Sequence, residues 1–224
     1  MSEAAAVLFD VDGTLVDTTC LHTVAWWEAL RQYGHHVAMP QVQRSIGMGA
    51  DQLLDHLLPD RDRAQDGELE AAHTSLYAQW WPVLRPLPGA RDLLYACAER
   101  GLRVVLASSA SQRELEVLLG VLDAREVIHA ATTADDVAAS KPAPDLVQVA
   151  LEKAGCPGDR AVFVGDTVWD VRAAGRAGVP CVGVESGGFC AAELSGEGAV
   201  EVYSDTAELL AALDGSRLRG PGRG

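Results

Sequence analysis

Four short apolar segments constrain the fold more than any other feature, because each is followed by a loop and an amphipathic, helix-like stretch. The segments are residues 6–10 (AVLFD), 102–109 (LRVVLASS), 161–166 (AVFVGD) and 179–185 (VPCVGVE). Runs of this length and composition are typical of buried parallel strands. The helix-like stretches are 89–100, 111–120, 144–154 and 168–177, with a weaker fifth strand at 126–132. This alternation predicts an α/β fold built on a Rossmann-like, doubly wound parallel sheet.

The alternation is interrupted between Asp17 and Leu87, where one helix-like stretch follows another. Apolar residues recur at helical spacing in three parts of this interval, 19–33, 50–58 and 68–81. An ordinary loop between a strand and a helix has about 2–6 residues, so an interval of this length needs a fold of its own. We therefore expect an all-helical cap domain inserted after the first strand.

The expected domain organisation has three parts. Residues 1–17 and 86–214 form the Rossmann-like core, residues 18–85 form the helical cap, and residues 215–224 form a disordered tail. The tail is expected to fray because it is rich in Gly and Arg and lies at the end of the chain.

Charge and composition narrow the choice of partners. The 224 residues carry a formal net charge of −14, which disfavours nucleic acid and anionic membrane surfaces. No apolar run is long enough to cross a bilayer and no signal peptide precedes the first strand, so we expect a cytoplasmic protein. The five cysteines are scattered without a CxxC pair, which favours reduced thiols over a zinc cluster or a disulfide framework. The sequence leaves a monomer and a homodimer equally open.

Polar side chains follow three of the four main strands, at ends that a parallel sheet brings to one edge. In chain order they are Asp10 with Asp12, Ser108 with Ser109, and Asp166. Lys141 lies just before a predicted helix. Carboxylate oxygens bind a hard cation, whereas a hydroxyl, an ammonium group and backbone amides bind an oxyanion. Since the chain is acidic, an anionic substrate needs a site made locally positive by such a cation and the lysine.

Four segments resemble the motifs of the haloacid dehalogenase-like hydrolase superfamily in their order and approximate spacing. They are DVDGTLVD (10–17), LASSAS (106–111), SKPAPD (140–145) and GDTVWD (165–170). The helical insert resembles the C1-type cap of the phosphatase and phosphomutase branch. The resemblance implies a phosphoric monoester hydrolase that acts on a small phosphorylated metabolite, such as a sugar phosphate or a phosphoglycolate-like compound, through an aspartyl-phosphate.

The resemblance also implies roles for the acidic residues. Asp10 would be the nucleophile, and Asp12 the general acid toward the leaving alcohol and then the base for water. Mg²⁺ would be held by Asp10, Asp166 and the backbone carbonyl of Asp12. Asp170 would support this metal site without binding the ion. Gly13 would let the chain turn sharply beyond the two acids.

The remaining expected contacts concern the phosphoryl group and the leaving group. Ser108 and the amide of Ser109 would bind phosphoryl oxygens, and Lys141 would offset the charge on nucleophile and phosphate. His22 resembles a histidine that the β-phosphoglucomutase-like branch places near the acid/base, and Gly47 resembles the glycine of the cap's specificity loop. His22 could equally be an ordinary helix histidine, and Gly47 an ordinary loop glycine. The roles of Trp169 and the cap tryptophans are also open.

Other functions are possible besides that of a phosphatase. True dehalogenases usually lack the second acid of the first motif, so Asp12 and Asp166 favour a phosphate over an organohalide. A β-phosphoglucomutase-like phosphomutase is the nearest alternative, but GMGADQ and TSLYAQW carry no basic residue for a second phosphate. An aspartate-phosphorylated receiver usually lacks a helical insert of this size, and a non-catalytic phosphate-binding protein is disfavoured because every motif residue is present.

Overall fold

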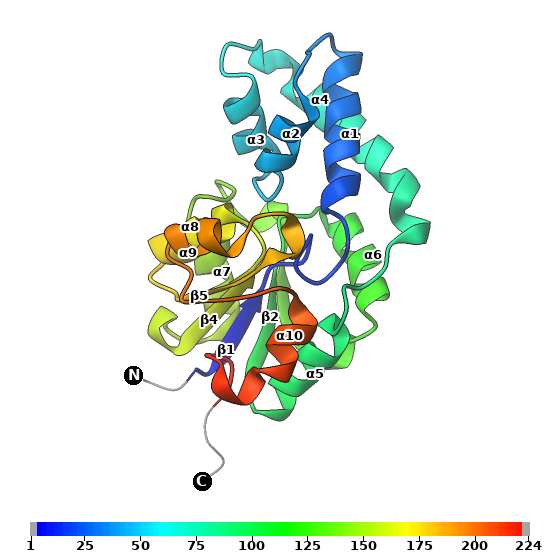
Figure 1. Cartoon of the computed structure of the whole chain (residues 1–224). Coiled ribbons are helices and arrows are strands. Elements are labelled where there is room, and N and C mark those ends of the chain that lie inside the picture. The colour runs from blue at the N-terminus through cyan, green and yellow to red at the C-terminus, as the bar shows by residue number, and fades with distance from the viewer. Residues whose placement is uncertain (1–3, 221–224) are drawn as a thin grey trace.

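The computed structural model describes residues 4–220, in which a parallel β-sheet lies beneath a layer of helices (Figure 1). Within these residues the sheet has six strands in the order β3-β2-β1-β4-β5-β6. The strands are β1 (Ala6–Phe9), β2 (Arg103–Ala107), β3 (Ile128–Thr132), β4 (Ala161–Gly165), β5 (Cys181–Val184) and β6 (Glu201–Tyr203). The order runs outward from β1 in both directions, so the predicted Rossmann-like, doubly wound α/β fold is confirmed.

Helices cover both faces of the sheet. They are α5 (Ala90–Glu99), α6 (Gln112–Leu122), α7 (Asp145–Ala154), α8 (Val168–Arg176), α9 (Ala191–Gly196) and α10 (Thr206–Ala211). Short 3₁₀ turns connect them: η3 (Arg125–Val127), η4 (Ala134–Asp136), η5 (Gly158–Arg160), η6 (Glu185–Gly187) and η7 (Leu213–Gly215). One apolar cluster contains residues of α5, α6 and α10, and the other contains residues of α7, α8 and α9. Each face of the sheet therefore has its own hydrophobic layer.

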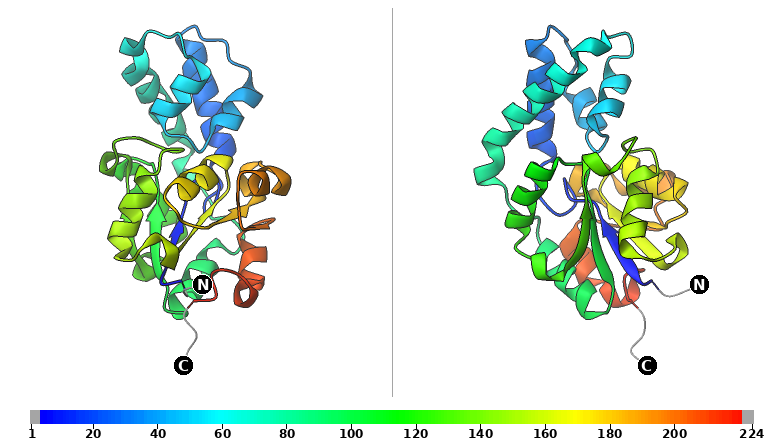
Figure 2. Two further views of the ribbon diagram at one scale, coloured as in Figure 1. Left: turned by 90° about the vertical axis from the view of Figure 1, so that its left-hand side faces the viewer. Right: turned by 180° about the vertical axis from the view of Figure 1, so that it is seen from behind.

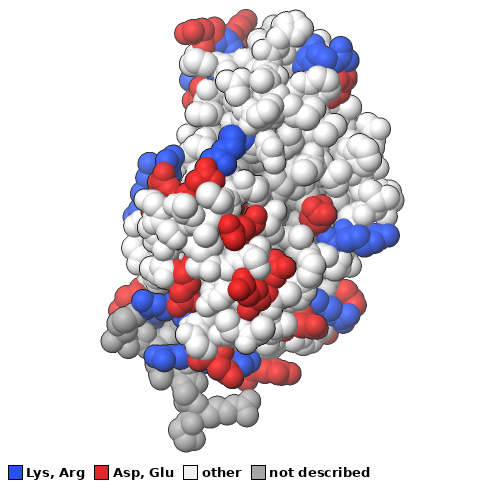
Figure 3. Space-filling view, viewed as in Figure 1, with Lys and Arg blue, Asp and Glu red and all other residues white. Residues whose placement is uncertain are grey.

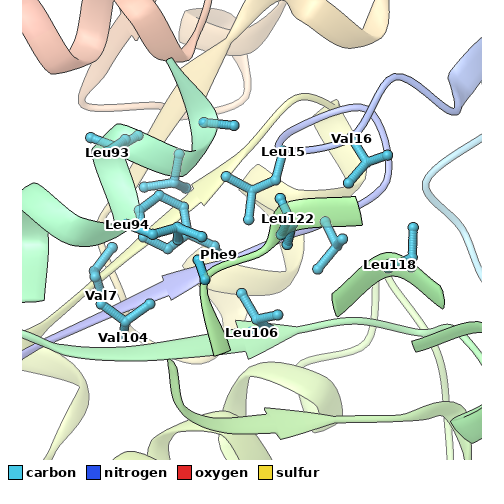
Figure 4. Packing of buried hydrophobic residues seen from close by; sticks show 14 of the residues in the cluster. Val7, Phe9, Leu15, Val16, Leu93, Leu94, Val104, Leu106, Leu118 and Leu122 are labelled. Carbon is cyan, nitrogen blue, oxygen red and sulfur yellow. The ribbon is translucent and has the colours of Figure 1, made fainter. Parts of the chain in front are cut away.

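The central strand β1 shows how the sequence builds both layers. Successive side chains of a strand point to opposite faces. Val7 and Phe9 accordingly join the first cluster, whereas Ala6 and Leu8 join the second, and all four are fully buried. Figure 4 shows the first cluster around Phe9, between the sheet and α5. A strand that is apolar on both faces is held rigidly, and so is the residue that follows it, Asp10.

The helical layer lies over the carboxyl ends of the strands (Figure 2). Its elements are α1 (Thr19–Gln32), α2 (Met39–Ser45), α3 (Ala50–Leu57), η1 (Arg63–Gln65), α4 (Asp66–Tyr77) and η2 (Ala78–Val83). A third apolar cluster draws all its residues from positions 26–69. The two connections to the sheet run side by side, since the amide of Asp17 donates to Arg85 O (3.1 Å) and that of Leu87 to Leu15 O (2.8 Å). These observations support our proposal to divide the chain into a core and a cap at the expected boundaries.

At the carboxyl end of the chain, one expectation fails and one strand appears that was not expected. Leu218 is fully buried in the first cluster, and the Ser216 hydroxyl donates to Leu213 O (2.9 Å). The expected disordered tail is therefore wrong for residues 215–220, because one apolar side chain reaches the core; positions 221–224 lie outside the described residues. Strand β6 was not expected, since it has three half-buried residues and no apolar run.

No helix among the described residues is long and apolar enough to cross a membrane. On the face of Figure 3, acidic side chains gather over the middle of the core, and basic ones lie mostly near the outline. This distribution follows the acidic composition of the chain.

Candidate active site

The sheet brings Asp10 and Asp166 together because β1 and β4 are neighbouring parallel strands. Phe9 pairs with Val164, and the amide of Asp10 donates to Val164 O (2.9 Å). The Thr14 hydroxyl lies between the two carboxylates, 2.7 Å from Asp166 Oδ1 and 3.2 Å from Asp10 Oδ2. The expected convergence of two acids from separate strands is therefore observed.

Lys141 places a buried positive charge among the acids. Its Nζ lies 2.6 Å from Asp10 Oδ1 and 2.8 Å from Asp170 Oδ1, and the whole residue is 1% exposed. Burial alone would lower the pKa of Lys141, but Asp10 and Asp170 raise it, so the ammonium form persists. Asp170 is held in turn by Thr167, whose amide and hydroxyl both donate to Asp170 Oδ2. The lysine is thus fixed beside Asp10 by a second acid, Asp170, which is the N3 residue of the capping box of helix α8.

The acids outnumber the lysine, and their pKa values reflect it. Burial raises the pKa of Asp10 against the opposing effect of Lys141, and burial followed by the charge of Asp10 raises that of Asp166. Asp166 Oδ2 is buried without a hydrogen-bond partner among the described residues. A Cβ on Gly187 or Gly13 would collide with it, at 1.7 and 2.4 Å. This oxygen therefore lies close to the backbone of two glycines, where a side chain would not fit.

The donor set fits a hard divalent cation. Oxygen atoms of Asp10, Asp166 and Asp170 lie within 4.8 Å of one another, and carboxylate oxygens are the ligands that such ions prefer. Both oxygens of Asp170 already accept hydrogen bonds, from Lys141 and Thr167, whereas Asp166 Oδ2 accepts none among the described residues. Within residues 4–220, Asp166 thus has a free oxygen for an ion and Asp170 does not, and the roles that the family resemblance implies for these two residues stay predictions.

The two serines of the second motif lie at different depths. Ser108 follows β2 and is 1% exposed, and its Oγ accepts a hydrogen bond from the amide of Ala110 (3.1 Å). Ser109 lines the pocket above Asp10. The Ser108 hydroxyl still has its own proton to donate, although Ser108 does not line the pocket. The expected phosphoryl contacts of both serines stay predictions.

The cap brings His22 to the second acid of the first motif. His22 Nε2 lies 3.4 Å from Asp12 Oδ1 and 3.7 Å from Glu114 Oε1. Burial opposes ionisation of both partners, but their mutual attraction prevails: the pKa of Asp12 is lowered and that of His22 is raised. The structure thus places His22 beside Asp12, and its expected role at the substrate stays a prediction.

The residues that surround His22 in the cap were not expected from the sequence. His22 Nδ1 lies 3.1 Å from His73 Nε2, the His22 ring stacks on Tyr77 at 3.8 Å between centroids, and His73 stacks on Trp26 at 4.2 Å. His22 and Trp26 are four residues apart on α1, and His73 and Tyr77 are four apart on α4. That spacing places each pair on one helix face, but nothing in the sequence shows that the two faces meet.

Gly47 lies where the cap loop approaches the core. Its φ is +98°, which favours glycine, and a Cβ there would lie 2.7 Å from Thr167 Cγ2. Gly47 also lines the pocket between cap and core, which has a cavity volume of about 160 Å³. The expected role of Gly47 in the specificity loop fits this position and stays a prediction.

Trp169 joins the core to the cap and does not line the pocket. Its Nε1 donates to Arg44 O (3.1 Å) in α2, and Arg172 stacks on its ring at 4.9 Å. The Arg44 side chain forms an ion pair with Glu193 of α9. The cap tryptophans divide: Trp26 belongs to the cap cluster and lines the pocket, Trp27 packs on that cluster, Trp81 packs on the core, and Trp80 is 39% exposed.

Asp10 lies at the end of a central parallel strand and pairs with a buried lysine beneath the helical layer. This arrangement is typical of capped α/β enzymes that bind an anionic group. More particularly, the chain belongs to the haloacid dehalogenase-like hydrolases, because the model of that family matches residues 4–178. The resemblance drawn from the four motifs is therefore confirmed.

Individual relatives agree with this assignment. A phosphoglycolate phosphatase of Pseudomonas savastanoi pv. phaseolicola is 30% identical over 91% of this chain and 78% of its own length. Protein CbbY of Cereibacter sphaeroides is 31% identical over 93% and 96%. The crystal structure of a hydrolase from Pseudomonas syringae superposes with a TM-score of 0.89 at 34% identity, covering 94% of this chain and 98% of the other. The chain is thus a phosphoric monoester hydrolase acting on small phosphorylated metabolites.

Proposed function

We propose that this enzyme hydrolyses a small phosphomonoester in the presence of Mg²⁺, with Asp10 as the nucleophile. The observation that carries the proposal is the position of Asp10, which lines the pocket while Lys141 holds its other side at 2.6 Å. Lys141 occupies Asp10 Oδ1 and so leaves Oδ2, which has only a long hydrogen bond from Thr14 (3.2 Å), to attack.

In the first step, Asp10 Oδ2 forms a bond to phosphorus while the bond from phosphorus to the ester oxygen breaks. Asp12 passes a proton to the departing alkoxide. Because the pKa of Asp12 is lowered and that of His22 is raised, the His22 imidazolium supplies this proton. In the second step, Asp12 takes a proton from water as the water oxygen attacks phosphorus, which releases phosphate and restores the Asp10 carboxylate. His22 Nε2 lies 3.4 Å from Asp12 Oδ1 and orients that carboxylate. After the second step, the proton that Asp12 took from water returns to His22.

The phosphoryl oxygens would be bound by Lys141, the Ser108 hydroxyl and the amide of Ser109. Asp10, Asp166 and the backbone carbonyl of Asp12 would hold Mg²⁺. When bound, the ion offsets the negative charge that the acids and the phosphoryl group bring together. Asp170 keeps Lys141 in place through its 2.8 Å ion pair.

Phosphomutase chemistry is the weaker candidate. A mutase must hold a substrate with a second phosphate, and among the described residues no Lys or Arg of the cap lines the pocket. Phosphoglycolate is the substrate in the names of several relatives whose alignments cover 91% of this chain, so it belongs in the test panel.

The test is phosphate release over a panel of phosphomonoesters, with Mg²⁺ and with EDTA, for the wild type and Asp10→Asn. We expect Asp10→Asn to reduce kcat by at least about 10³-fold, since it removes the nucleophile. The matched control is Asp92→Asn, an identical change at an exposed position of α5, which should keep full activity. Activity that survives in Asp10→Asn would refute the assignment, and isomer formation from a hexose 1-phosphate with its bisphosphate would indicate the mutase.

A further inference from the structure

The pocket that would receive the leaving alcohol is acidic. Asp12 and Glu114 line it from the core, and Glu70 lines it from α4. The Lys and Arg side chains of the described residues contribute a single member to this lining, Lys141, whose ammonium is already bound by Asp10 and Asp170. No cation thus remains in the lining to meet a negative charge on the leaving group.

The histidines do not supply that cation. His22 lies between Asp12 at 3.4 Å and Glu114 at 3.7 Å, so its positive charge is already compensated by two acids. His73 is kept neutral, because burial and then the charge of His22 lower its pKa well below the usual value. The two rings therefore offer shape and hydrogen bonds to a ligand, with no surplus positive charge.

Two arginines, Arg44 of α2 and Arg113 of α6, also have partners elsewhere. Arg44 pairs with Glu193 and lies over the ring of Phe189 at 3.9 Å. Arg113 lies over the ring of Trp81 at 5.0 Å. Neither side chain lines the pocket.

Glu114 points to what the leaving group carries instead. Its side chain is 13% exposed. Within residues 4–220 its neighbour of opposite charge is His22, whose Nε2 lies beyond hydrogen-bond distance at 3.7 Å. The backbone of Ser111 donates one hydrogen bond to this carboxylate. A carboxylate can accept several, so a ligand hydroxyl or ammonium group would add a donor that this nearly buried side chain lacks. The cavity of about 160 Å³ corresponds to roughly five water molecules, which leaves room for a few atoms beyond the phosphoryl group.

We propose that the enzyme selects phosphomonoesters of small alcohols whose remainder is neutral or cationic, and that Glu114 discriminates against a carboxylate or a second phosphate at that position. This inference rests on the proposed phosphatase function. It separates the chain from its relatives named for phosphoglycolate, because the second group of that substrate is a carboxylate.

Three substrates of nearly equal size test the proposal. Carboxymethyl phosphate (phosphoglycolate), 2-hydroxyethyl phosphate and 2-aminoethyl phosphate differ in the charge at one end of a two-carbon alcohol. We expect kcat/KM for the carboxylate to be the lowest, by about 10- to 100-fold, since like charges are brought together in a confined site. Where turnover of a compound is too slow to follow, its competition with p-nitrophenyl phosphate gives the same order as inhibition constants.

Glu114→Gln keeps the shape of the side chain and removes its charge. We expect the ratio of kcat/KM between the carboxylate and the hydroxyl substrate to rise about tenfold in this variant, whereas a merely structural role would lower all three values together. Glu68→Gln removes an equal charge from α4 outside the pocket and should leave the ratio unchanged. Thr74→Lys, which adds a cation to the pocket lining, should also raise the ratio.

The outcomes separate the two proposals. Asp10-dependent hydrolysis of p-nitrophenyl phosphate supports the phosphatase function by itself. If the carboxylate is then as good a substrate or inhibitor as the hydroxyl compound, or if Glu114→Gln leaves the ratio unchanged, the selectivity proposal is wrong while the function stands. Absence of Asp10-dependent hydrolysis overturns both.

Discussion

The core half and the cap half of the active site treat charge in opposite ways. In the core half, three buried aspartates lie close together, and the buried Lys141 forms ion pairs with two of them, Asp10 and Asp170. In the cap half, rings from α1 and α4 stack on one another, and no Lys or Arg of the described cap residues enters the pocket. The core half is thus suited to bind a phosphoryl group, and we expect the pocket beneath the cap to decide which leaving groups are accepted.

This difference extends to how each half is held in place. The core half depends on compensation between buried charges, whose loss affects both folding and chemistry. The cap half depends on its own apolar cluster and on a few contacts to the core, at Gly47, Trp169 and the ion pair of Arg44 with Glu193. Changes in the core half should therefore alter stability and kcat, and changes at the cap contacts should mainly alter KM.

Lys141→Met should have the largest effect, because it leaves Asp10, Asp166 and Asp170 buried without an internal cation. We expect the free energy of unfolding in EDTA to fall by about 3–5 kcal/mol, and kcat to become undetectable. Mg²⁺ should restore part of the lost stability, since it binds the folded acids. Urea unfolding with and without Mg²⁺ measures both.

Lys153→Met is the matched control for this comparison. Lys153 also pairs with an aspartate, Asp136 at 2.9 Å, but its side chain is 32% exposed. Its loss should cost less than about 1 kcal/mol. If the two variants lose the same unfolding free energy, burial of the charge does not distinguish Lys141 from an exposed lysine.

Much of the core half could be predicted from the sequence. Strand ends in a parallel sheet meet at one edge, so the order of the motifs was enough to bring Asp10 and Asp166 together beside Lys141. The role of Asp170 in holding Lys141 and the unpartnered oxygen of Asp166 were beyond the sequence, since both depend on distances between side chains from separate elements.

The cap half was mostly beyond sequence reasoning, for a physical reason. Helix spacing shows which residues share a face, but how α1 rotates against α4 is decided by packing of many small contacts. His22 was selected only through its resemblance to a known position, and its partners His73 and Glu114 were missed. The buried Leu218 was missed likewise, because one apolar residue in a Gly-rich segment gives no periodicity.

Gly47→Ala should have the next largest effect, and it should separate closure of the cap from stability. A side chain at φ +98° costs about 1–3 kcal/mol, and this Cβ would also push against Thr167 at 2.7 Å. We expect KM to rise about tenfold as the cap is displaced from the core, with the unfolding free energy falling only by the backbone cost. Steady-state kinetics and urea unfolding give the two quantities.

Gly34→Ala is the control that isolates the backbone cost. Gly34 has a similar φ of +81°, and nothing lies within 4 Å of its added Cβ. This variant should lose a similar unfolding free energy and keep the wild-type KM. If KM rises equally in both variants, the approach of Gly47 to Thr167 has no part in closing the cap.

Trp169→Phe should have the smallest effect, because it removes one hydrogen bond and keeps most of the ring. The lost contact is the 3.1 Å bond from Trp169 Nε1 to Arg44 O, whose net contribution is about 0.5–1.5 kcal/mol. Since that bond joins α8 of the core to α2 of the cap, its loss should raise KM about 2- to 5-fold and leave kcat unchanged. Trp27→Phe makes the same change on the cap's own cluster, where the described residues show no hydrogen bond to the core, and should leave KM unchanged. A fall in kcat with constant KM for Trp169→Phe would instead assign this residue to the chemistry of the core half.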